Sequence, residues 1–394
     1  MQRLQQLSGF LVANYFIRRF DKRTSSDIFR VNLRLRSDKG PRFAILGAGN
    51  GGLAMAGHLA LLGYPVRIYT RSKERIRNIQ DRGAIVVQGR VVGNGVVEKA
   101  TNDVKEAVDE ADIIMIVVPA MGHKFFAEQC APHLRSGQIV ILNPGRTFGA
   151  IEFLQILRNM TPADVTVAET QTFLYVSRQL DYAKANIVAI KNSVALASIP
   201  AQRTAHALSA IRKVFPQFVS ATSVLETSLD NFGAIFHPAI TIFNAPRIEG
   251  KTDFEFYTEG LTPSVARTVE LLDAERLALG QALGVHLHTA KEWLHSAYDS
   301  TGSNVYEATQ ATLGYRGVKA PTSLMHRYLI EDIPMGLVPM SSLGDRLNVP
   351  TPTMDALIDI ACALHSTDYW REGRTLEKLG LSTLSVEQIR SFVE

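Results

Sequence analysis

An apolar segment that ends in three spaced glycines constrains the fold of this chain more than any other feature. Residues 43–52 read FAILGAGNGG and precede an amphipathic segment over residues 53–62. In a strand–turn–helix unit with G-x-G-x-x-G spacing, the glycines permit a tight turn, close approach of a pyrophosphate and close helix packing. The N–H groups at the helix start favour an anionic phosphate. The segment therefore predicts a dinucleotide-binding loop, formed by Gly47, Ala48, Gly49, Asn50, Gly51 and Gly52.

The end of the next predicted strand, residues 65–69, selects between the two nicotinamide coenzymes. An acidic side chain there would bind the ribose 2′-hydroxyl of NAD, whereas a basic one suits the 2′-phosphate of NADP. The strand is followed by Thr70, Arg71 and Ser72, without a carboxylate at the tip. Arg71 is suited to pairing with a phosphate, and the hydroxyls to donating hydrogen bonds. The sequence favours NADP(H) over NAD(H); the alternative is a solvated basic helix start.

Strand and helix patterns alternate from residue 42 to about residue 222, which predicts an α/β Rossmann-type domain with a doubly wound parallel sheet. Residues 111–118 form a nearly continuous apolar run, typical of a buried central strand. Pro119 and His123 follow it at the carboxyl end, where open α/β sheets bind ligands. Residues 84–97 suggest a hairpin, and residues 182–190 are expected to close the sheet.

From residue 223 the apolar residues recur at helical spacing and strand signals disappear, which predicts an all-α C-terminal domain. The expected helices cover residues 224–246, 263–282, 289–298, 321–331, 334–344, 353–366 and 384–393. Three regions result: a basic N-terminal extension (1–40), a Rossmann-type domain (41–222) and a helical substrate domain (223–394).

Composition excludes several classes of function. The net charge of +4 is mild, and no basic patch interleaved with aromatic residues indicates nucleic-acid binding. No apolar run approaches the ~20 residues of a membrane span. The two cysteines, Cys130 and Cys362, provide neither a disulfide framework nor metal-ligand spacing, which fits a cytoplasmic protein without a metal site.

The first forty residues hold nine Lys/Arg and a short apolar helical face. They are interpreted as a helix that packs on the chain or on a partner, as in a homodimer, or as sequence upstream of the natural start. A basic membrane-surface helix is the less favoured alternative.

Two segments of the helical region contain candidates for chemistry. His237 lies in an apolar helix directly before Pro238, where a buried ring needs hydrogen-bond partners. By itself it is either a catalytic acid/base or a satisfied core histidine. Residues 326–334 read HRYLIEDIP, in which Arg327 can grip a carboxylate and Asp332 can orient a histidine. The alternative is a charged helix end before a proline.

Taken together, these segments resemble the opine dehydrogenases, the octopine/nopaline dehydrogenase family. The resemblance rests on GAGNGG at 47–52, VVPAMGH at 117–123, NPG at 143–145, AET at 168–170, NxxxxxHPA at 231–239 and HRYLxEDIP at 326–334. It implies an NAD(P)H-dependent enzyme that condenses an amino acid with a 2-oxo acid in a cleft between two domains. It also implies His237 as general acid/base, Asp332 as its partner and Arg327 as a substrate-carboxylate anchor.

Proton chemistry of this kind requires His237 and Asp332 to meet, so a hydrogen bond of roughly 2.6–3.2 Å is expected between them. His123, Tyr175 and Arg178 are further candidates to line the substrate pocket, with packing or surface positions as the alternative. Two other functions stay open. One is an NADP-dependent reductase of a single 2-oxo or 2-hydroxy acid, and the other is a catalytically silent NADP-binding sensor.

Overall fold

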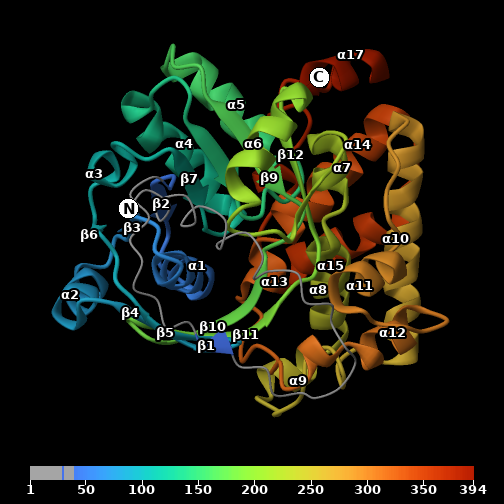
Figure 1. The fold of residues 1–394 in the computed structure, drawn as a ribbon. Helices are drawn as coiled ribbons and strands as arrows, with labels where there is room; N and C mark the ends of the chain where they lie inside the picture. Colours follow the sequence, from blue (N-terminus) through green and yellow to red (C-terminus); the bar gives the residue numbers. More distant parts are fainter. Residues whose placement is uncertain (1–28, 31–39) are drawn as a thin grey trace, which may run out of the picture.

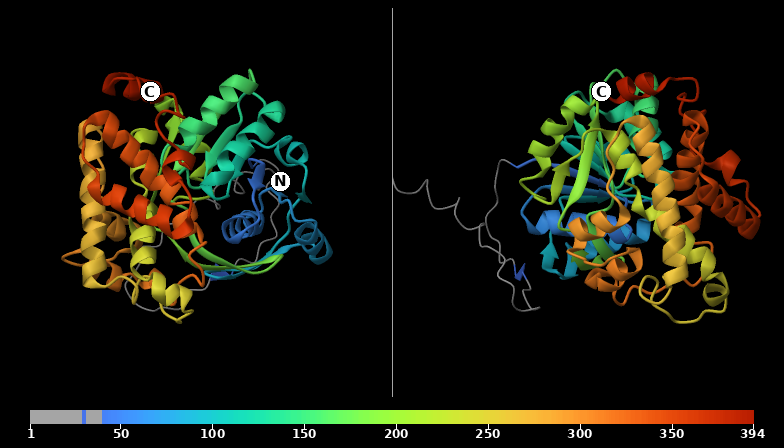
Figure 2. Two further views of the ribbon diagram at one scale, coloured as in Figure 1. Left: turned by 180° about the vertical axis from the view of Figure 1, so that it is seen from behind. Right: turned by 90° about the vertical axis from the view of Figure 1, so that its right-hand side faces the viewer.

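The computed structural model describes residues 29–30 and 40–394, so the predicted N-terminal extension lies almost wholly outside the described residues. The described chain forms an α/β lobe and a helical lobe that lie side by side (Figures 1 and 2). None of the helices in this part of the chain combines the length and apolarity needed to traverse a lipid bilayer.

The α/β lobe contains an eight-stranded sheet in the order β13-β12-β9-β8-β7-β2-β3-β6. Neighbouring strands are parallel except β9 and β12, which confirms the predicted doubly wound sheet. Strands β2, β7, β8 and β9 are buried along their length, because helices cover both faces. The strands are β2 (Phe43–Leu46), β3 (Val66–Tyr69), β6 (Lys99–Thr101), β7 (Ile113–Ile116), β8 (Ile139–Leu142), β9 (Thr166–Thr170), β12 (Val194–Ile199) and β13 (Phe218–Ser220). The helices are α1 (Asn50–Leu61), α2 (Lys73–Arg82), α3 (Val104–Val108), α4 (His123–Cys130), α5 (Gly149–Met160) and α6 (Thr204–Ile211).

A second sheet covers α1 on the side away from the main sheet (Figure 1). Its strands, in spatial order, are β1 (Phe29–Arg30), β5 (Val91–Gly95), β4 (Ile85–Gly89), β11 (Lys184–Ile190) and β10 (Tyr175–Asp181). The predicted hairpin over residues 84–97 is confirmed as β4 and β5. The expectation that residues 182–190 close the main sheet is wrong, because β11 pairs with β10 and β4. The approach to α1 is close: a side chain at Gly57 would collide with Val87.

The helical lobe begins after β13, and the predicted boundary at 222/223 falls in the loop before its first helix. Its helices are α7 (Val224–Leu229), α8 (Phe232–Phe243), α9 (Ala245–Glu249), α10 (Pro263–Leu283), α11 (Ala290–Tyr298), α12 (Val305–Ala311), α13 (Arg327–Ile330), the π-helix η5 (Ile333–Leu337), α14 (Val338–Leu347), α15 (Pro352–His365), α16 (Tyr369–Glu372) and α17 (Val386–Val393). Predicted helices 263–282, 289–298, 353–366 and 384–393 correspond to α10, α11, α15 and α17. Helices α12 and α16 were not predicted.

Two predicted helices are wrong in extent. The helix expected over residues 224–246 is interrupted at Asp230 and Asn231, whose buried side chains bond to Arg276 and Arg146. The helix expected over residues 321–331 is reduced to the four residues of α13. At Asp230 and Asn231, tertiary hydrogen bonds of buried polar side chains override the local helical pattern.

Alternate residues of the central strands point into two different cores. Phe43 and Ile45 of β2 pack with α1 and the second sheet. Ala44 and Leu46 belong to a larger apolar cluster that also contains α4, α5 and the interior of the helical lobe. The helical lobe therefore shares a continuous core with one face of the main sheet, and this fixes its position beside the ends of the parallel strands.

Candidate active site

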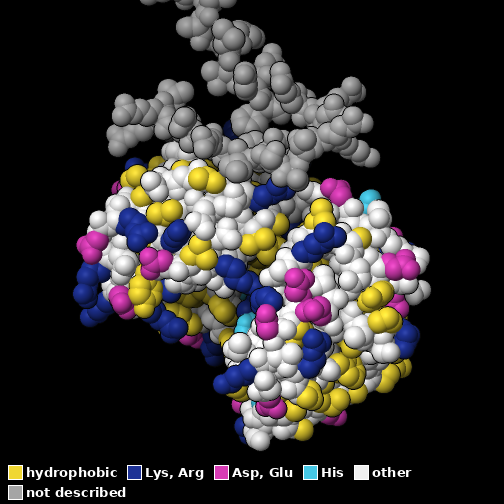
Figure 3. Space-filling view, turned by 90° about the horizontal axis from the view of Figure 1, so that it is seen from below, with side chains coloured by type: hydrophobic (Ala, Val, Ile, Leu, Met, Phe, Trp, Pro, Cys, Tyr) yellow, Lys and Arg dark blue, Asp and Glu magenta, His cyan; other side chains and the backbone are white. Residues whose placement is uncertain are grey.

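A cavity of about 390 Å³ lies where the carboxyl ends of the main-sheet strands face the helical lobe. The molecule is hollowed between its lobes, and Lys and Arg side chains lie along this hollow (Figure 3). The α/β lobe contributes the glycine loop, residues 117–119 and the segments around Asn143 and Phe173. The helical lobe contributes an aromatic wall and the two segments that hold His237 and Arg327.

The glycine loop has the geometry that a dinucleotide requires. Gly47 has a φ of 114°, and a side chain there would collide with the backbone of the Val117 strand end. A side chain at Gly52 would collide with the Gly47 carbonyl, so this glycine lets α1 approach β2. Nothing lies within 4 Å of the position that a Cβ at Gly49 would occupy, which leaves room for a phosphate at the N-terminus of α1. These residues fit a nicotinamide dinucleotide.

The loop is also anchored to the second sheet. The Asn50 side chain accepts a hydrogen bond of 2.7 Å from the Gln179 amide, and the Asn50 carbonyl accepts one of 3.0 Å from the Ser177 hydroxyl. Gly51 lies against the Phe173 ring. Contacts with β10 and the segment before it therefore position the loop before any ligand binds.

The residues predicted to select the coenzyme lie at the end of β3. Thr70 is buried and its hydroxyl accepts a hydrogen bond from the Ser72 amide, while the Ser72 hydroxyl caps α2 by accepting from Arg75. Arg71 is exposed and belongs to no ion pair among the described residues. Pro119 lies at the cavity wall.

His237 lines the cavity and meets Asp332, which is buried behind the cavity wall, in the hydrogen bond expected from the sequence. Nδ1 of His237 lies 2.7 Å from an Asp332 carboxylate oxygen, and Nε2 lies 2.8 Å from the Tyr257 hydroxyl. Because a carboxylate only accepts, Nδ1 donates to Asp332, and Nε2 of the neutral ring accepts from Tyr257. Burial lowers the pKa of His237, and the Asp332 charge opposes that shift.

Aromatic rings fix the orientation of this pair. The imidazole of His237 stacks on Tyr328 with ring centroids 4.1 Å apart, and Tyr257 stacks on Tyr315 at 3.9 Å. Tyr257 was not identified from the sequence; the segment around it carries no motif, and the pairing appears only in the fold. The arrangement restricts His237 to one rotamer and directs Nε2 and the Tyr257 hydroxyl to the cavity.

A buried cluster of alternating charges supports the pair. Nε of Arg146 donates to a Glu331 carboxylate oxygen at 3.2 Å. A terminal nitrogen of Arg146 lies 3.3 Å from an Asp332 carboxylate oxygen. Glu331 also accepts from the Ala120 amide and from Nε of Arg327 at 2.8 Å. Burial would raise the pKa of Glu331, but Arg327 and Arg146 outweigh it and hold that pKa well below its ordinary value. Two arginines thus balance two carboxylates.

The predicted substrate-binding residues occupy different environments. Arg327 lines the cavity with its side chain 44% exposed. Tyr175 also lines the cavity, although its hydroxyl is bonded to His58 on α1 at 2.9 Å. His123 does not line it: the ring is fully buried beside Gly149, and burial holds its pKa well below the ordinary value. The prediction for His123 is wrong because its strand end turns into α4, which carries the ring into the core.

The sequence did not identify Arg146 or Lys191, which also line the cavity. Arg146 follows the NPG motif directly and has a φ of 58°, a left-handed conformation that is rare outside glycine. The sequence signal that could have identified Arg146 is its position shortly after a strand end, where open α/β sheets bind ligands. Lys191 directly follows β11, at the start of the turn into β12, and no local pattern marks it.

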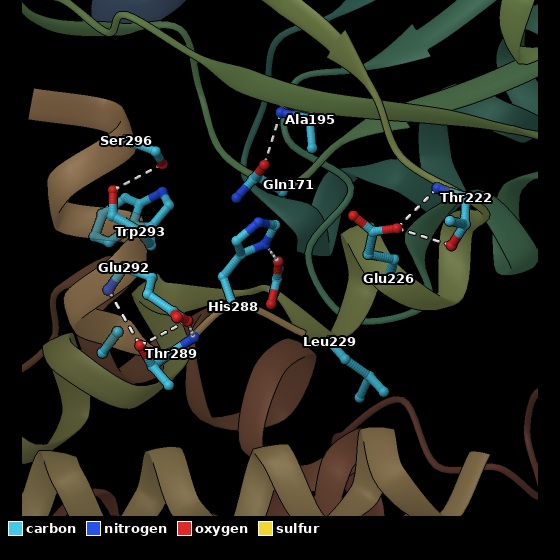
Figure 4. Close-up of polar contacts among 12 residues, drawn as sticks. Gln171, Ala195, Thr222, Glu226, Leu229, His288, Thr289, Glu292, Trp293 and Ser296 are labelled. Atoms are coloured by element: carbon cyan, nitrogen blue, oxygen red, sulfur yellow. Dashed lines mark hydrogen bonds and ion pairs between the residues drawn. The ribbon is translucent and has the colours of Figure 1, made fainter. Parts of the chain in front are cut away.

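A second polar cluster lies outside this cavity, around α7 and α11. Glu226, Asp230 and His288 each offer a ligand atom within 4.8 Å of the others, a geometry that can hold a metal ion. Figure 4 shows Glu226 accepting from Thr222 and shows His288 beside the start of α11. Asp230 already forms an ion pair with Arg276 at 2.6 Å, so a protein cation neutralises its carboxylate.

Comparisons with known proteins cover nearly the whole described chain. Residues 220–365 match the family described as NAD/NADP octopine/nopaline dehydrogenase, alpha-helical domain. Residues 42–148 match NAD-dependent glycerol-3-phosphate dehydrogenase N-terminus. The opine dehydrogenase of Arthrobacter sp. (strain 1C) is 44% identical over 353 residues, which are 89% of this chain and 98% of that protein.

Solved structures with the same fold include two with bound coenzyme. Octopine dehydrogenase with NADH and L-arginine has a TM-score of 0.74 and 21% identity, covering 90% of this chain and 98% of that chain. Yersinopine dehydrogenase with NADP⁺ has a TM-score of 0.69 and 16% identity, covering 89% and 99%. At these identities the likeness establishes the fold.

Proposed function

The chain belongs to the opine dehydrogenase family of NAD(P)-dependent oxidoreductases acting on CH–NH bonds, and we propose that the cavity between its lobes is the active site. In the reaction an amino acid, a 2-oxo acid, NAD(P)H and a proton give an N-(1-carboxyalkyl) amino acid, NAD(P)⁺ and water. The observation that carries the proposal is the hydrogen-bonded series Asp332–His237–Tyr257, which ends in the cavity opposite the glycine loop.

His237 is proposed to move the protons of the condensation. In its protonated form, His237 carries a second proton on Nε2. As the amine adds to the carbonyl carbon, the ring gives this proton to the carbonyl oxygen and recovers one from the amine nitrogen. It then protonates the hydroxyl group, which leaves as water, and the C–N bond becomes that of the protonated imine. Asp332 holds the ring in one tautomer and stabilises the imidazolium. The bound coenzyme supplies the hydride that reduces the imine carbon.

Arg327 is proposed to anchor one substrate carboxylate. Its Nε is engaged by Glu331, which fixes the plane of the guanidinium. Its two terminal nitrogens make no hydrogen bond with the described residues, and the half-exposed side chain lines the cavity. A planar fork held in this way can position a carboxylate through parallel hydrogen bonds.

The cavity wall supports an amino-acid substrate with an uncharged side chain. The one acidic residue among the described lining, Glu331, is neutralised by two arginines. The helical lobe contributes the aromatic residues Phe232, Phe236, Tyr257, Trp293, Tyr298, Tyr315 and Tyr328. A cationic side chain would find no free carboxylate there. Apolar amino acids are therefore proposed as the preferred amine substrates.

A two-substrate assay tests this function. With pyruvate fixed, NADPH oxidation should depend on added leucine or phenylalanine, kcat/KM for arginine should be at least tenfold lower, and mass spectrometry should detect the N-(1-carboxyethyl) amino acid. Oxidation that needs only the 2-oxo acid would identify a single-substrate reductase instead. Coenzyme binding without turnover on any pair would identify a silent binding protein.

NADP(H) is the proposed coenzyme. Arg71 is exposed just after β3, forms no ion pair with the described residues and has no acidic residue next to it in the sequence. Arg71→Ala should raise KM for NADPH about tenfold or more and KM for NADH less than twofold, since it removes a charged hydrogen bond to the 2′-phosphate. Arg77→Ala, on the exposed side of α2, is the control and should alter neither. A wild-type enzyme that prefers NADH, or equal effects on both coenzymes, would contradict the assignment.

A further inference from the structure

Lys191 is a buried ammonium group for which the described fold provides no counter-ion. The residue is 5% exposed and lines the cavity after the end of β11. Its Nζ donates to the Thr172 hydroxyl at 3.3 Å and to the Phe173 carbonyl, and it lies 5.8 Å from the centre of the Tyr298 ring. No carboxylate of the described chain lies within 4 Å of it. Both acceptors are neutral, although a buried charge is normally paired.

Neighbouring positive charges raise the free-energy cost of keeping the Lys191 ammonium group without a counter-ion. Burial, together with the neighbouring charges of Arg146 and Arg327, lowers the pKa of Lys191 to about 7. Those two arginines are balanced by Glu331 and Asp332, whereas Lys191 is balanced by nothing in the described cavity wall. Protonated Lys191 therefore places an unbalanced positive charge at a fixed position in the cavity wall, and an anionic ligand beside it would favour this charged form.

The proposed reaction supplies such an anion. Its imine intermediate and its product both carry two carboxylates, one from the amino acid and one from the 2-oxo acid. Arg327 offers a binding fork for one of them and cannot hold both through its two remaining nitrogens. We propose that Lys191 binds the second substrate carboxylate, an inference that rests on the proposed function. Arg327 and Lys191 then each bind one of the two carboxylates of the imine.

Because Arg327 and Lys191 are assigned to different carboxylates, replacing each residue should raise KM for a different substrate. Lys191→Met should raise KM about 10- to 100-fold for one of the two substrates, the loss expected for a charged hydrogen bond. Arg327→Met should raise KM by a similar factor for the other substrate. Neither should change KM for NADPH more than about twofold. Lys184→Met, the same replacement at the outer end of β11, is the control and should leave all three constants unchanged.

Lys191→Gln separates charge from packing, because its amide can still donate to Thr172 and Phe173. It should reproduce the substrate effect of Lys191→Met at an unchanged melting temperature. The assignment is overturned if neither Lys191 variant alters a substrate KM, or if Lys191 and Arg327 variants weaken the same substrate.

A direct binding measurement keeps this inference separate from the function itself. In calorimetry with the NADP⁺-bound protein, N-(1-carboxyethyl)leucine should bind the Lys191 variants about 10- to 100-fold more weakly than the wild type. Equal binding would exclude Lys191 as the second anchor even if the wild type turns over both substrates. A wild type that needs no amine substrate would refute the proposed function, and the calorimetric comparison would still decide whether Lys191 holds a carboxylate.

Discussion

His237→Ala is expected to lower kcat about 10²- to 10⁴-fold and to leave KM for NADPH nearly unchanged. The range is that of a positioned general acid/base, and the ring lies in the helical lobe, away from the glycine loop. Asp332→Asn should lower kcat nearly as much, because it removes the carboxylate that accepts from Nδ1 at 2.7 Å. The double variant should be little worse than the worse single one, since the two residues act as a unit.

The pH profile provides a second readout of this pair. Burial lowers the pKa of His237 and the Asp332 charge raises it, so Asp332→Asn should lower the pKa further. Reductive condensation needs the protonated ring, so its rate falls as pH rises through the His237 pKa. In Asp332→Asn that decline should begin at a lower pH than in the wild type. An unchanged decline would remove Asp332 from its assigned role.

The fold provides a matched control for the histidine. His365 also bonds a tyrosine hydroxyl, that of Tyr369 at 2.6 Å, but it lies on α15 away from the cavity. His365→Ala should leave kcat within about twofold of the wild type. Additive losses in the His237/Asp332 double variant, or a comparable loss of kcat in the control, would exclude the catalytic pair.

Arg276→Met is expected to lower the free energy of unfolding by about 3–5 kcal/mol, the usual result of removing one partner from a buried ion pair. Arg276 has no exposed surface and bonds Asp230 at 2.6 Å and Asp273 at 2.7 Å. It also donates to the carbonyls of Leu229 and His288. The variant leaves Asp273 without its cation and leaves Asp230 with only His288, at 3.0 Å, as a partner that can carry positive charge.

Urea unfolding followed by circular dichroism measures this change as a lower transition midpoint. Arg267→Met, on an exposed face of the same helix α10, removes only one hydrogen bond, to Ser264, and should alter stability by less than about 0.5 kcal/mol. If Arg276→Met lost no more than Arg267→Met, the buried ion network would not stabilise the fold.

Local sequence patterns were sufficient where the structure depends on neighbours in the chain. The spacing of Gly47, Gly49 and Gly52 specifies a strand, a turn and a helix, and the apolar run at 111–118 can only be a buried strand or a core helix. The contact between His237 and Asp332 came from two motifs that resemble one family, because no periodicity relates residues 95 positions apart. The second sheet was missed because β4 and β11 pair across 98 positions of the chain, as from Val86 to Lys184.

The remaining parts of the site depend on side chains that long-range packing brings together. Tyr257 reaches His237 only once the helical lobe has folded, and Arg146 reaches Glu331 only once the two lobes have packed. Asp230 breaks a predicted helix because it binds Arg276, which lies 46 positions later. His123 has the position of a ligand-binding residue in the sequence, yet its ring turns into the core. Such outcomes follow from tertiary contacts that no window of sequence contains.

The pairing of Arg146 with Glu331 has a consequence for motion, because the two residues belong to different lobes. Arg374 makes a second such crossing by bonding Glu152 of α5 at 2.7 Å. Rotating one lobe away from the other would break these ion pairs and leave buried charges without partners, at a cost of several kcal/mol for each pair broken. These two ion pairs therefore oppose rigid-body separation of the lobes.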